Sequence, residues 1–452
     1  MMGREGGLSA PVAEVSVFFA IGGHVPIDET GHRCPSPRLP DMGRPTLALS
    51  ELRRRAEAEL IQDILPFWVR HAFDPATGYL AGVVTTDLRR FDEVPRHVVL
   101  CARLLWTFAA AARFERRPEW LETGRRAFAL LTGPFWDARQ GGVFWSLDRD
   151  GGVFSDRKQI YAQAFAIYGL AEWHAATGDA TALARARTLF ELIEQHAAEP
   201  KHGGYLEARS VSWGGLADLR LSDRDLNAPK SMNTLLHVLE AYTTLFRVWP
   251  DPGLRGRLQT LLGVMLDHVV TTTPHTRCEL FFDLEWRPLS PTISYGHDIE
   301  ASWLLWEAAE ALGDPALLAR TRRVALDMAA GVLAHGCDTD GSIFYEGRAD
   351  RIVIPEKHWW PQAEAVVGFL NAHALDGGEA WLEAAGRVWQ FIENHVIDRN
   401  HGEWFAELDR SGHPVPDYPE RAGSCKIGPW KCPYHNARAC LEIMRRVPAS
   451  AL

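Results

Sequence analysis

The sequence repeats one short pattern, in which a helix ends in a tight turn and a second helix begins directly after it. The pattern occurs five times, in the segments FERRPEW, ATGDATA, VWPDPGL, ALGDPAL and ALDGGEA. Its markers stand 61 to 72 residues apart, at Pro118, Asp179, Asp251, Asp314 and Asp376. Gly-Asp and Pro-Asp turns stop one helix and cap the next, so the repeat predicts a series of helix hairpins.

The two helices of each hairpin differ in their apolar faces. The first is apolar on most sides, as in IEASWLLWEAAEAL, and such a helix lies inside a protein. The second is amphipathic, as in PALLARTRRVALDMAAGVL. A first outer helix at about 48–72 and a last inner helix at about 432–447 complete a sixth pair. We therefore predict an all-α fold, an (α/α)6 barrel of twelve helices in two concentric rings, as one domain over residues 47–452.

Long segments rich in glycine and aromatic residues lead from each outer helix to the next inner helix, for example GGVFWSLDRDGGVF and HGEWFAELDRSGHP. They are expected to meet at the face of the barrel where the inner helices begin, and long loops on a rigid scaffold commonly carry sites. Residues 1–46 are instead rich in Gly and Pro and show no periodicity. We expect them to form a loosely ordered N-terminal extension.

Composition argues against several classes of function. The net charge is -10 and no basic run stands out, so nucleic acid is not an expected partner. Seven cysteines without a CxxC motif favour a reduced, cytoplasmic protein. No segment is typical of a transmembrane span, so no membrane partner is expected. Cys425, Cys432 and His435 lack a fourth ligand at the usual spacing, and we predict no metal site.

Polar and aromatic side chains gather at the starts of the predicted inner helices. Asn233 and His237, for instance, are four residues apart and share one helix face. Each of these residues alone has a structural explanation, because single histidines are often hydrogen-bonded core residues and tryptophans often fill cores. Packing alone does not explain three histidines at equivalent positions around one ring. The candidate site residues are His237, His297, His435, Arg103, Tyr161, Asn233, Glu300, Trp359, Trp360 and Trp430.

Proton transfer is the chemistry that these residue types suit. A helix N-terminus disfavours imidazolium, so we expect His297 and His435 to be neutral and to act as bases near pH 7. Histidines on opposite walls of a cavity serve opposite faces of one carbon, where one removes a proton and the other returns one. We expect Glu300 to orient His297 and Arg103 to stabilise an enolate oxygen. Asp298 is expected to cap its helix.

Five segments of the chain resemble the cellobiose 2-epimerases of the N-acylglucosamine 2-epimerase superfamily. They are YAQAFAIYGLAEWHAATGD, KSMNTLLHVLEAY, SYGHDIEASWLLWEA, KHWWPQAEAV and WKCPYHNARACLEI, and the resemblance runs from about residue 50 to about residue 446. It implies an (α/α)6 barrel that converts the reducing-end glucose of a β-1,4-linked disaccharide to mannose, with no metal and no cofactor. The implied route is ring opening, proton abstraction at C2 to a cis-enediolate, rotation about C2–C3, reprotonation and ring closure.

The same resemblance implies roles for the candidate residues. His297 and His435 become the acid/base pair, and His237 assists with Glu300 beside it. Contacts to the sugars are implied for Arg103, Tyr161, Asn233, Trp359, Trp360 and Trp430. One departure is Leu235, which stands where the family often has histidine, on a different helix face from His237. It is expected to affect substrate preference more than chemistry.

Three alternatives stay open on the sequence. An aldose–ketose isomerase or a monosaccharide 2-epimerase, acting on mannose or an N-acylglucosamine, would use the same enediolate. An inverting glycoside hydrolase would need two carboxylates across the bond, for which Asp298 and Glu364 are the candidates. A non-catalytic sugar-binding protein would keep the tryptophans without needing three histidines. A small carbohydrate is the expected partner throughout, and we expect a monomer or a weak homodimer.

Overall fold

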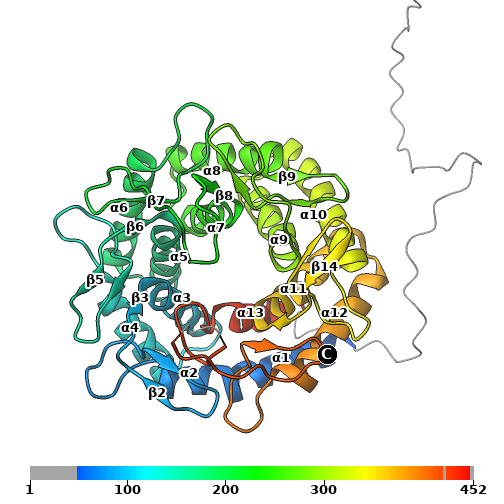
Figure 1. Ribbon diagram of the computed structural model, residues 1–452, viewed down its shortest axis with the longest axis horizontal. Helices are drawn as coiled ribbons and strands as arrows, with labels where there is room; N and C mark the ends of the chain where they lie inside the picture. The colour runs from blue at the N-terminus through cyan, green and yellow to red at the C-terminus, as the bar shows by residue number, and fades with distance from the viewer. Residues whose placement is uncertain (1–47, 421–423, 448–452) are drawn as a thin grey trace, which may run out of the picture. The chain divides into compact units, whose positions relative to one another are not determined.

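Two concentric rings of helices make up the computed structural model, which describes residues 48–420 and 424–447 (Figure 1). The inner ring consists of α3 (Val98–Phe114), α5 (Ile160–Thr177), α7 (Met232–Val248), α9 (Tyr295–Leu312), α11 (Trp359–Asp376) and α13 (Tyr434–Arg446). The expected extension over residues 1–46 lies outside the described residues.

The outer ring also has six members, three of which contain a short π-helical stretch. They are α1-η1-α2 (Leu49–Glu59, Leu60–Ile64, Leu65–His71), α4 (Pro118–Thr132), α6 (Ala180–His196), α8-η2 (Pro252–Val264, Met265–Val269), α10 (Pro315–His335) and α12-η3 (Glu379–Phe391, Ile392–Val396). The last inner helix, α13, packs against α11, α3 and α1, and so closes both rings. The prediction of an (α/α)6 barrel is confirmed.

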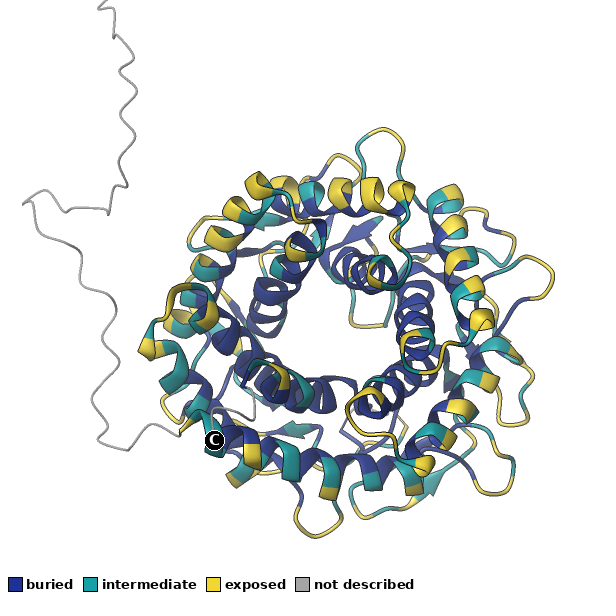
Figure 2. Ribbon diagram, turned by 180° about the vertical axis from the view of Figure 1, so that it is seen from behind, coloured by how far each residue is buried: buried dark blue, intermediate teal, exposed yellow. Residues whose placement is uncertain are grey.

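Burial follows the two rings as the apolar patterns predicted. Residues 160–173 of α5 are all buried, whereas the outer helices bury one face and expose the other (Figure 2). Within residues 48–420 and 424–447, no helix is long and apolar enough to cross a membrane.

The short turns lie at one end of the barrel and stop and start helices as expected. The side chains of Asp179, Asp251 and Asp314 each accept hydrogen bonds from two backbone N–H groups in the first turn of the following helix. The first and fifth turns differ, because the N-caps of α4 and α12, Arg117 and Gly378, make no side-chain bond. Asp376 instead ends α11 and accepts a hydrogen bond from the Gly378 N–H at 2.8 Å.

Short strands occupy the other end, where the inner helices begin. A two-residue strand directly precedes each of the first five inner helices and pairs antiparallel with a strand of the next loop around the ring. These pairs are β3 (Arg96–His97) with β4 (Ser146–Leu147), β6 (Lys158–Gln159) with β7 (Ala208–Arg209), β8 (Lys230–Ser231) with β11 (Phe281–Phe282), β12 (Ile293–Ser294) with β13 (Glu346–Arg348), and β15 (Lys357–His358) with β16 (Glu407–Leu408).

The remaining strands extend these loops or pair within them. They are β1 (Val83–Val84), β2 (Arg90–Phe91), β5 (Val153–Ser155), β9 (Val270–Thr271), β10 (Arg277–Cys278) and β14 (Arg351–Ile354). No strand directly precedes α13 among the residues described there; a single bridge joins Ile427 to Val84 of β1.

Buried ion pairs fasten the two ends of four of these loops. In each, a lysine in the segment that leads into an inner helix bonds to an acidic residue just after the preceding outer helix, and the lysine is almost completely buried. The pairs are Lys158–Asp137 (2.8 Å), Lys230–Glu199 (3.2 Å), Lys357–Asp338 (2.9 Å) and Lys426–Asp398 (2.9 Å). Because a buried charge is stable only when paired, the first three pairs fix where α5, α7 and α11 begin, and the fourth holds the segment that leads toward α13.

Candidate active site

The predicted site residues come together around the ring at the starts of the inner helices. The ring centroids of His297 and Trp360 lie 4.7 Å apart, and those of Trp360 and His435 lie 5.5 Å apart. On another part of the ring, Tyr161 lies 5.1 Å from His237, centroid to centroid. Side chains from five inner helices therefore lie close together, in two groups, at the loop end of the barrel.

His435 is held by a carboxylate of the neighbouring inner helix. Its Nδ1 lies 2.7 Å from Oε1 of Glu364, whose Oε2 accepts a hydrogen bond from the Trp303 indole at 3.1 Å. Among the residues that the structure describes, Nε2 of His435 has no hydrogen-bond partner, so this nitrogen is available to a ligand. Burial, followed by the charges of Arg103 and Arg438, holds the pKa of His435 well below its usual range.

His237 has a similar partner on its own helix. Its Nδ1 lies 2.8 Å from Oε2 of Glu240, and Oε1 of Glu240 accepts hydrogen bonds from Tyr434 and Arg438. Burial raises the pKa of Glu240, but the nearby Arg438 guanidinium and His237 outweigh it and leave that pKa below its usual value. Glu240 is therefore ionised, and its carboxylate can accept a hydrogen bond from the N–H at Nδ1 of His237.

No carboxylate among the described residues bonds to His297, and the expectation that Glu300 orients it is wrong. Nδ1 of His297 lies 2.8 Å from the hydroxyl of Ser294, one helical turn earlier. Burial, with smaller contributions from His237 and Arg103, lowers the pKa of His297 to about 3. The imidazole is thus neutral at physiological pH, as predicted, but the main cause is burial and not the helix N-terminus that the prediction invoked.

Arg438 is the charged residue that sequence reasoning missed. Its Nη2 donates to Oε1 of Glu300 at 2.6 Å and to Oε1 of Glu364 at 2.7 Å, and its Nη1 donates to Glu240. One buried guanidinium thus joins α7, α9 and α11 to α13. Burial, then the charge of Glu364, raises the pKa of Glu300 to about 7. The available signal was an arginine three residues after His435, on an inner helix.

Three of the residues around Arg438 are of the types that bind metal ions. Ligand atoms of Glu300, Glu364 and His435 all lie within 4.8 Å of one another. Nη2 of Arg438 contacts both carboxylates at hydrogen-bond distance, so a guanidinium already supplies the positive charge at the place that a cation would take.

Arg103 and Asn233 present unused polar atoms at the site. Nη2 of Arg103 donates to the Tyr161 hydroxyl at 2.7 Å, and its guanidinium lies over the Phe165 ring, 4.2 Å from the centroid. Within the described residues, Nε of Arg103 and Oδ1 of Asn233 are buried without a hydrogen-bond partner. Because buried polar groups are normally paired, these two atoms are suited to bind a polar ligand.

The three predicted tryptophans have different surroundings. Trp360 lies next to both His297 and His435, whereas Trp430 lies 6.2 Å from Tyr161, centroid to centroid. Trp359 is edge-on to His435 at 6.2 Å and is nearly covered. Trp360 is also nearly covered but lies next to two histidines, and Trp430 is half-buried; these two have the placement of sugar-packing residues, and Trp359 that of a supporting residue.

Asp298 does not cap α9, contrary to expectation. Its Oδ1 accepts a hydrogen bond at 2.8 Å from the backbone N–H of Cys278 in β10, and burial raises its pKa to about 7. The carboxylate thus fastens a loop to the inner helix. Of the two candidate carboxylates for glycoside hydrolysis, Glu364 is bound by Arg438 and Trp303, and Asp298 is bound to the loop through one oxygen.

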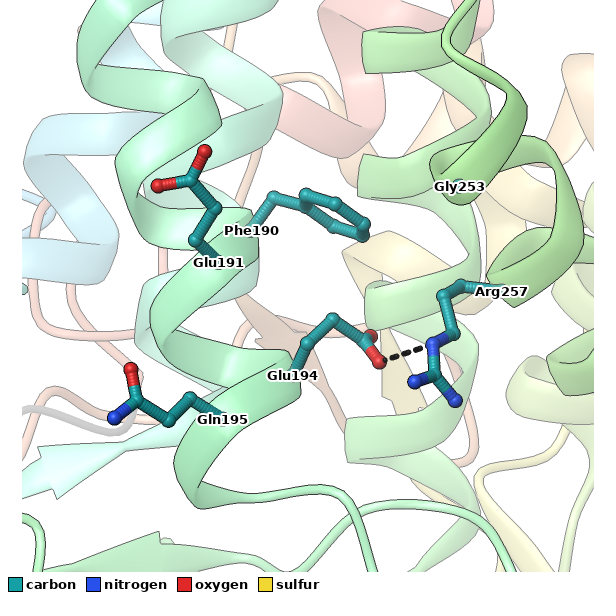
Figure 3. Close-up of a pocket in the computed structure, with 6 residues that line it drawn as sticks. All are labelled: Phe190, Glu191, Glu194, Gln195, Gly253 and Arg257. Carbon is teal, nitrogen blue, oxygen red and sulfur yellow. Dashed lines mark ion pairs between the residues drawn. The ribbon is translucent and has the colours of Figure 1, made fainter.

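A shallow groove in the outer ring lies between α6 and α8 (Figure 3). Its central carboxylate, Glu194, lies 2.9 Å from Nε of Arg257 and accepts hydrogen bonds from the hydroxyls of Tyr205 and Tyr242. None of the predicted site residues lines it. These contacts join neighbouring outer and inner helices and are structural.

Comparison with known proteins identifies the family. The sequence profile of N-acylglucosamine 2-epimerase (GlcNAc 2-epimerase) matches residues 82–428. A cellobiose 2-epimerase from Bacteroides fragilis is 42% identical over 395 residues, covering 87% of this chain and 98% of the relative. A D-mannose isomerase from Marinomonas mediterranea is 22% identical over 405 residues, covering 85% of this chain and 95% of the relative.

The solved structure of cellobiose 2-epimerase from Spirochaeta thermophila DSM 6192 matches with a TM-score of 0.81 and 40% identity, covering 91% of this chain and all of that one. The resemblance inferred from the five segments is confirmed. This chain belongs to the N-acylglucosamine 2-epimerase family.

Proposed function

We propose that the protein is a cellobiose 2-epimerase, which interconverts glucose and mannose at the reducing end of β-1,4-linked disaccharides. The observation that carries the proposal is the placement of two neutral imidazoles, His297 and His435, beside the same indole, with ring centroids 4.7 and 5.5 Å from that of Trp360. The identity of 42% to a cellobiose 2-epimerase over most of both chains supports the same activity.

The contacts of the histidines suit them to proton transfer at C2 of an open-chain sugar. Oε1 of Glu364 accepts a hydrogen bond from the N–H at Nδ1 of His435. The proton of the neutral ring is then on Nδ1, and the lone pair on Nε2 can act as the base. As Nε2 takes the C2 proton, the negative charge of Glu364 stabilises the imidazolium that forms. His297, bonded to a hydroxyl instead, serves the other face of C2 once the enediolate has rotated, and the two exchange roles in the reverse reaction.

Stabilisation of the enediolate falls to Arg103 and Tyr161. A permanently charged guanidinium beside a phenol hydroxyl gives two donors for an oxygen on which negative charge develops. Asn233 offers a free carbonyl oxygen to a sugar hydroxyl, and Trp360 and Trp430 offer flat faces to the sugar rings. The role of His237, backed by Glu240, is to hold the reacting hydroxyls in line.

Incubation with cellobiose in heavy water, followed by NMR, tests this function. The expected product is glucosyl-mannose with deuterium at C2. Methyl β-cellobioside is the matched control, because it cannot open its reducing-end ring and is expected to remain unchanged. Free glucose from either sugar would indicate hydrolysis, and a ketose with deuterium at C1 would indicate isomerisation; either as the main product contradicts the proposal.

A further inference from the structure

One turn of the barrel departs from its two sister turns at a single residue. After α4, α6 and η3, the chain makes the same turn, in which an acidic residue's N–H donates to the carbonyl five residues later, at 2.9 Å each time. The last two residues of the turn have left-handed backbones in all three cases. They are Gly141–Gly142, Gly203–Gly204 and Gly402–Glu403, and the φ of Glu403 is 63°.

Glycine adopts this conformation freely, whereas any other residue is strained by its Cβ. Strained residues persist where their surroundings hold them, and they gather at functional sites. Glu403 is completely buried, so its side chain is not a chance surface substitution. The presence of a glutamate at this position, where the other two turns have glycine, therefore needs a physical reason.

The Glu403 carboxylate bonds to both ends of the segment that leads into α13. One oxygen, Oε1, accepts a hydrogen bond from the Asn436 amide at 2.7 Å, and Oε2 accepts one from the buried ammonium of Lys431. Oε1 also accepts from the indole of Trp68 at 3.2 Å, in the first outer helix. The backbone N–H of Glu403 donates to Asp63 at 2.9 Å, which holds the turn itself in place.

The anchored segment carries the reactive end of α13. Lys431 directly follows Trp430, and Asn436 directly follows His435. Between them, the sulfur of Cys432 lies 3.8 Å from Nη1 of Arg103. The other five inner helices start from a strand that is paired with the next loop, whereas none is described directly before α13. The Glu403 carboxylate provides the attachment that a paired strand provides elsewhere.

We propose that Glu403 is a positioning residue, which holds Trp430 and His435 in their working geometry through Lys431 and Asn436. This inference rests on the proposed function, in which both residues act on the sugar. A purely structural role would affect stability alone. A positioning role also affects the turnover of enzyme that is fully folded.

Two variants distinguish a structural role from a positioning role. One removes the Glu403 carboxylate alone, and the other removes it together with the ammonium of Lys431. Glu403→Gly matches the sister turns and relieves the backbone strain, but it leaves Lys431 buried without a counter-charge. The double variant Glu403→Gly/Lys431→Met removes both charges and is expected to recover thermal stability. We expect kcat on cellobiose, measured well below each midpoint of unfolding, to remain about 10- to 100-fold low in both, since a shift of about 1 Å in a catalytic group costs this much.

Two further variants complete the comparison. Glu403→Gln keeps an oxygen for Asn436 and is expected to show a kcat between those of the wild type and Glu403→Gly. Glu194→Gln, in the outer-ring groove (Figure 3), removes a carboxylate that also accepts two tyrosine hydroxyls, and should lower stability with kcat unchanged. Wild-type kcat in the double variant, or an equal loss of kcat in Glu194→Gln, would overturn the inference. If the double variant does not fold, the comparison is made between Glu403→Gln and Glu194→Gln. A lower kcat in Glu403→Gln alone supports the inference, and an equal kcat in both overturns it.

A readout without substrate distinguishes this inference from the proposed function. If the wild type leaves cellobiose unchanged, the proposed function fails on its own. NMR spectra of protein labelled with ¹⁵N-histidine then test the positioning role, with signals assigned from His435→Gln and His297→Gln. We expect the ring nitrogens of His435 to shift in the double variant while those of His297 stay in place. An unchanged His435 signal would overturn the inference.

Discussion

Nδ1 of His435 lies 2.7 Å from a carboxylate oxygen of Glu364, on the neighbouring inner helix. Nδ1 of His297, the other proposed acid/base residue, lies 2.8 Å from the hydroxyl of Ser294. The two imidazoles thus both stand near the start of an inner helix but differ in their capacity to hold a positive charge. This asymmetry has measurable consequences for each of them.

Glu364→Gln is expected to lower kcat for epimerisation by about 100-fold, the lower end of what general acid–base catalysis contributes. An amide has almost the shape of the carboxyl group but does not stabilise the imidazolium of His435. KM should change little, because no contact between Glu364 and the sugar is proposed. Glu172→Gln, which loses the partner of Arg113 near the far end of α5, is the matched control and should retain wild-type kcat. A similar kcat in both variants would contradict the role of Glu364.

Replacing either histidine should separate proton exchange from inversion. His297→Asn and His435→Asn are each expected to lose about 1000-fold or more of the epimerisation rate, since each removes a general acid/base. The histidine that remains can still remove and return a proton on one face. Deuterium from heavy water should therefore enter C2 of unreacted cellobiose in at least one variant, as NMR would detect. Full epimerase activity in both variants would show that the site assignment is wrong.

The fold was predictable because its signals are local. Three of the five turns carry an aspartate that caps the next helix, and the apolar pattern of each inner helix differs from that of its outer partner. The loop end of the barrel follows from the same order of helices. The grouping of the candidate residues was therefore predicted correctly without knowledge of any long-range contact.

The partners of the histidines were not predictable in this way. Glu300 stands three residues after His297 and shares its helix face, yet its carboxylate bonds to Arg438, 138 residues later. Glu364 and His435 are 71 residues apart. Such pairs depend on how neighbouring inner helices are rotated against each other, which periodicity does not fix. The left-handed Glu403 is different, since HGEW can be compared directly with HGGY in the sister loop.

Glu59 should make the fold less stable as pH rises. Burial, then the charge of Asp63, raises its pKa to about 8, whereas an unfolded glutamate titrates near pH 4.3. The folded state therefore binds the extra proton between these values, and stability falls as pH rises from about 4 to about 8. Glu59→Gln removes this penalty and should stabilise the protein at pH 9, by up to about 1.4 kcal/mol for each unit by which folding raises the pKa.

Urea unfolding at pH 5 and pH 9 measures this effect. The gain in free energy of unfolding for Glu59→Gln should be larger at pH 9, and the bond from the Trp404 indole to Oε1 is available to the amide as well. Glu57→Gln, two residues earlier on the same helix and half-buried, is the matched control. An equal gain at both pH values would show that Glu59 is ionised in the same range in both states.

The buried pair Lys158–Asp137 tests how the inner helices are fixed at their starts. Both side chains are almost fully buried, and Nζ lies 2.8 Å from Oδ2. Lys158→Met leaves Asp137 without its counter-charge, so the free energy of unfolding should fall by about 3 kcal/mol. Lys158→Met/Asp137→Asn should recover much of this loss, because the amide oxygen can still accept the N–H groups of Arg139 and Gln140. Lys201→Met, at an exposed turn, provides the control. A loss in the double variant as large as in Lys158→Met would mean that packing around the lysine stem, and not its charge, holds the start of α5.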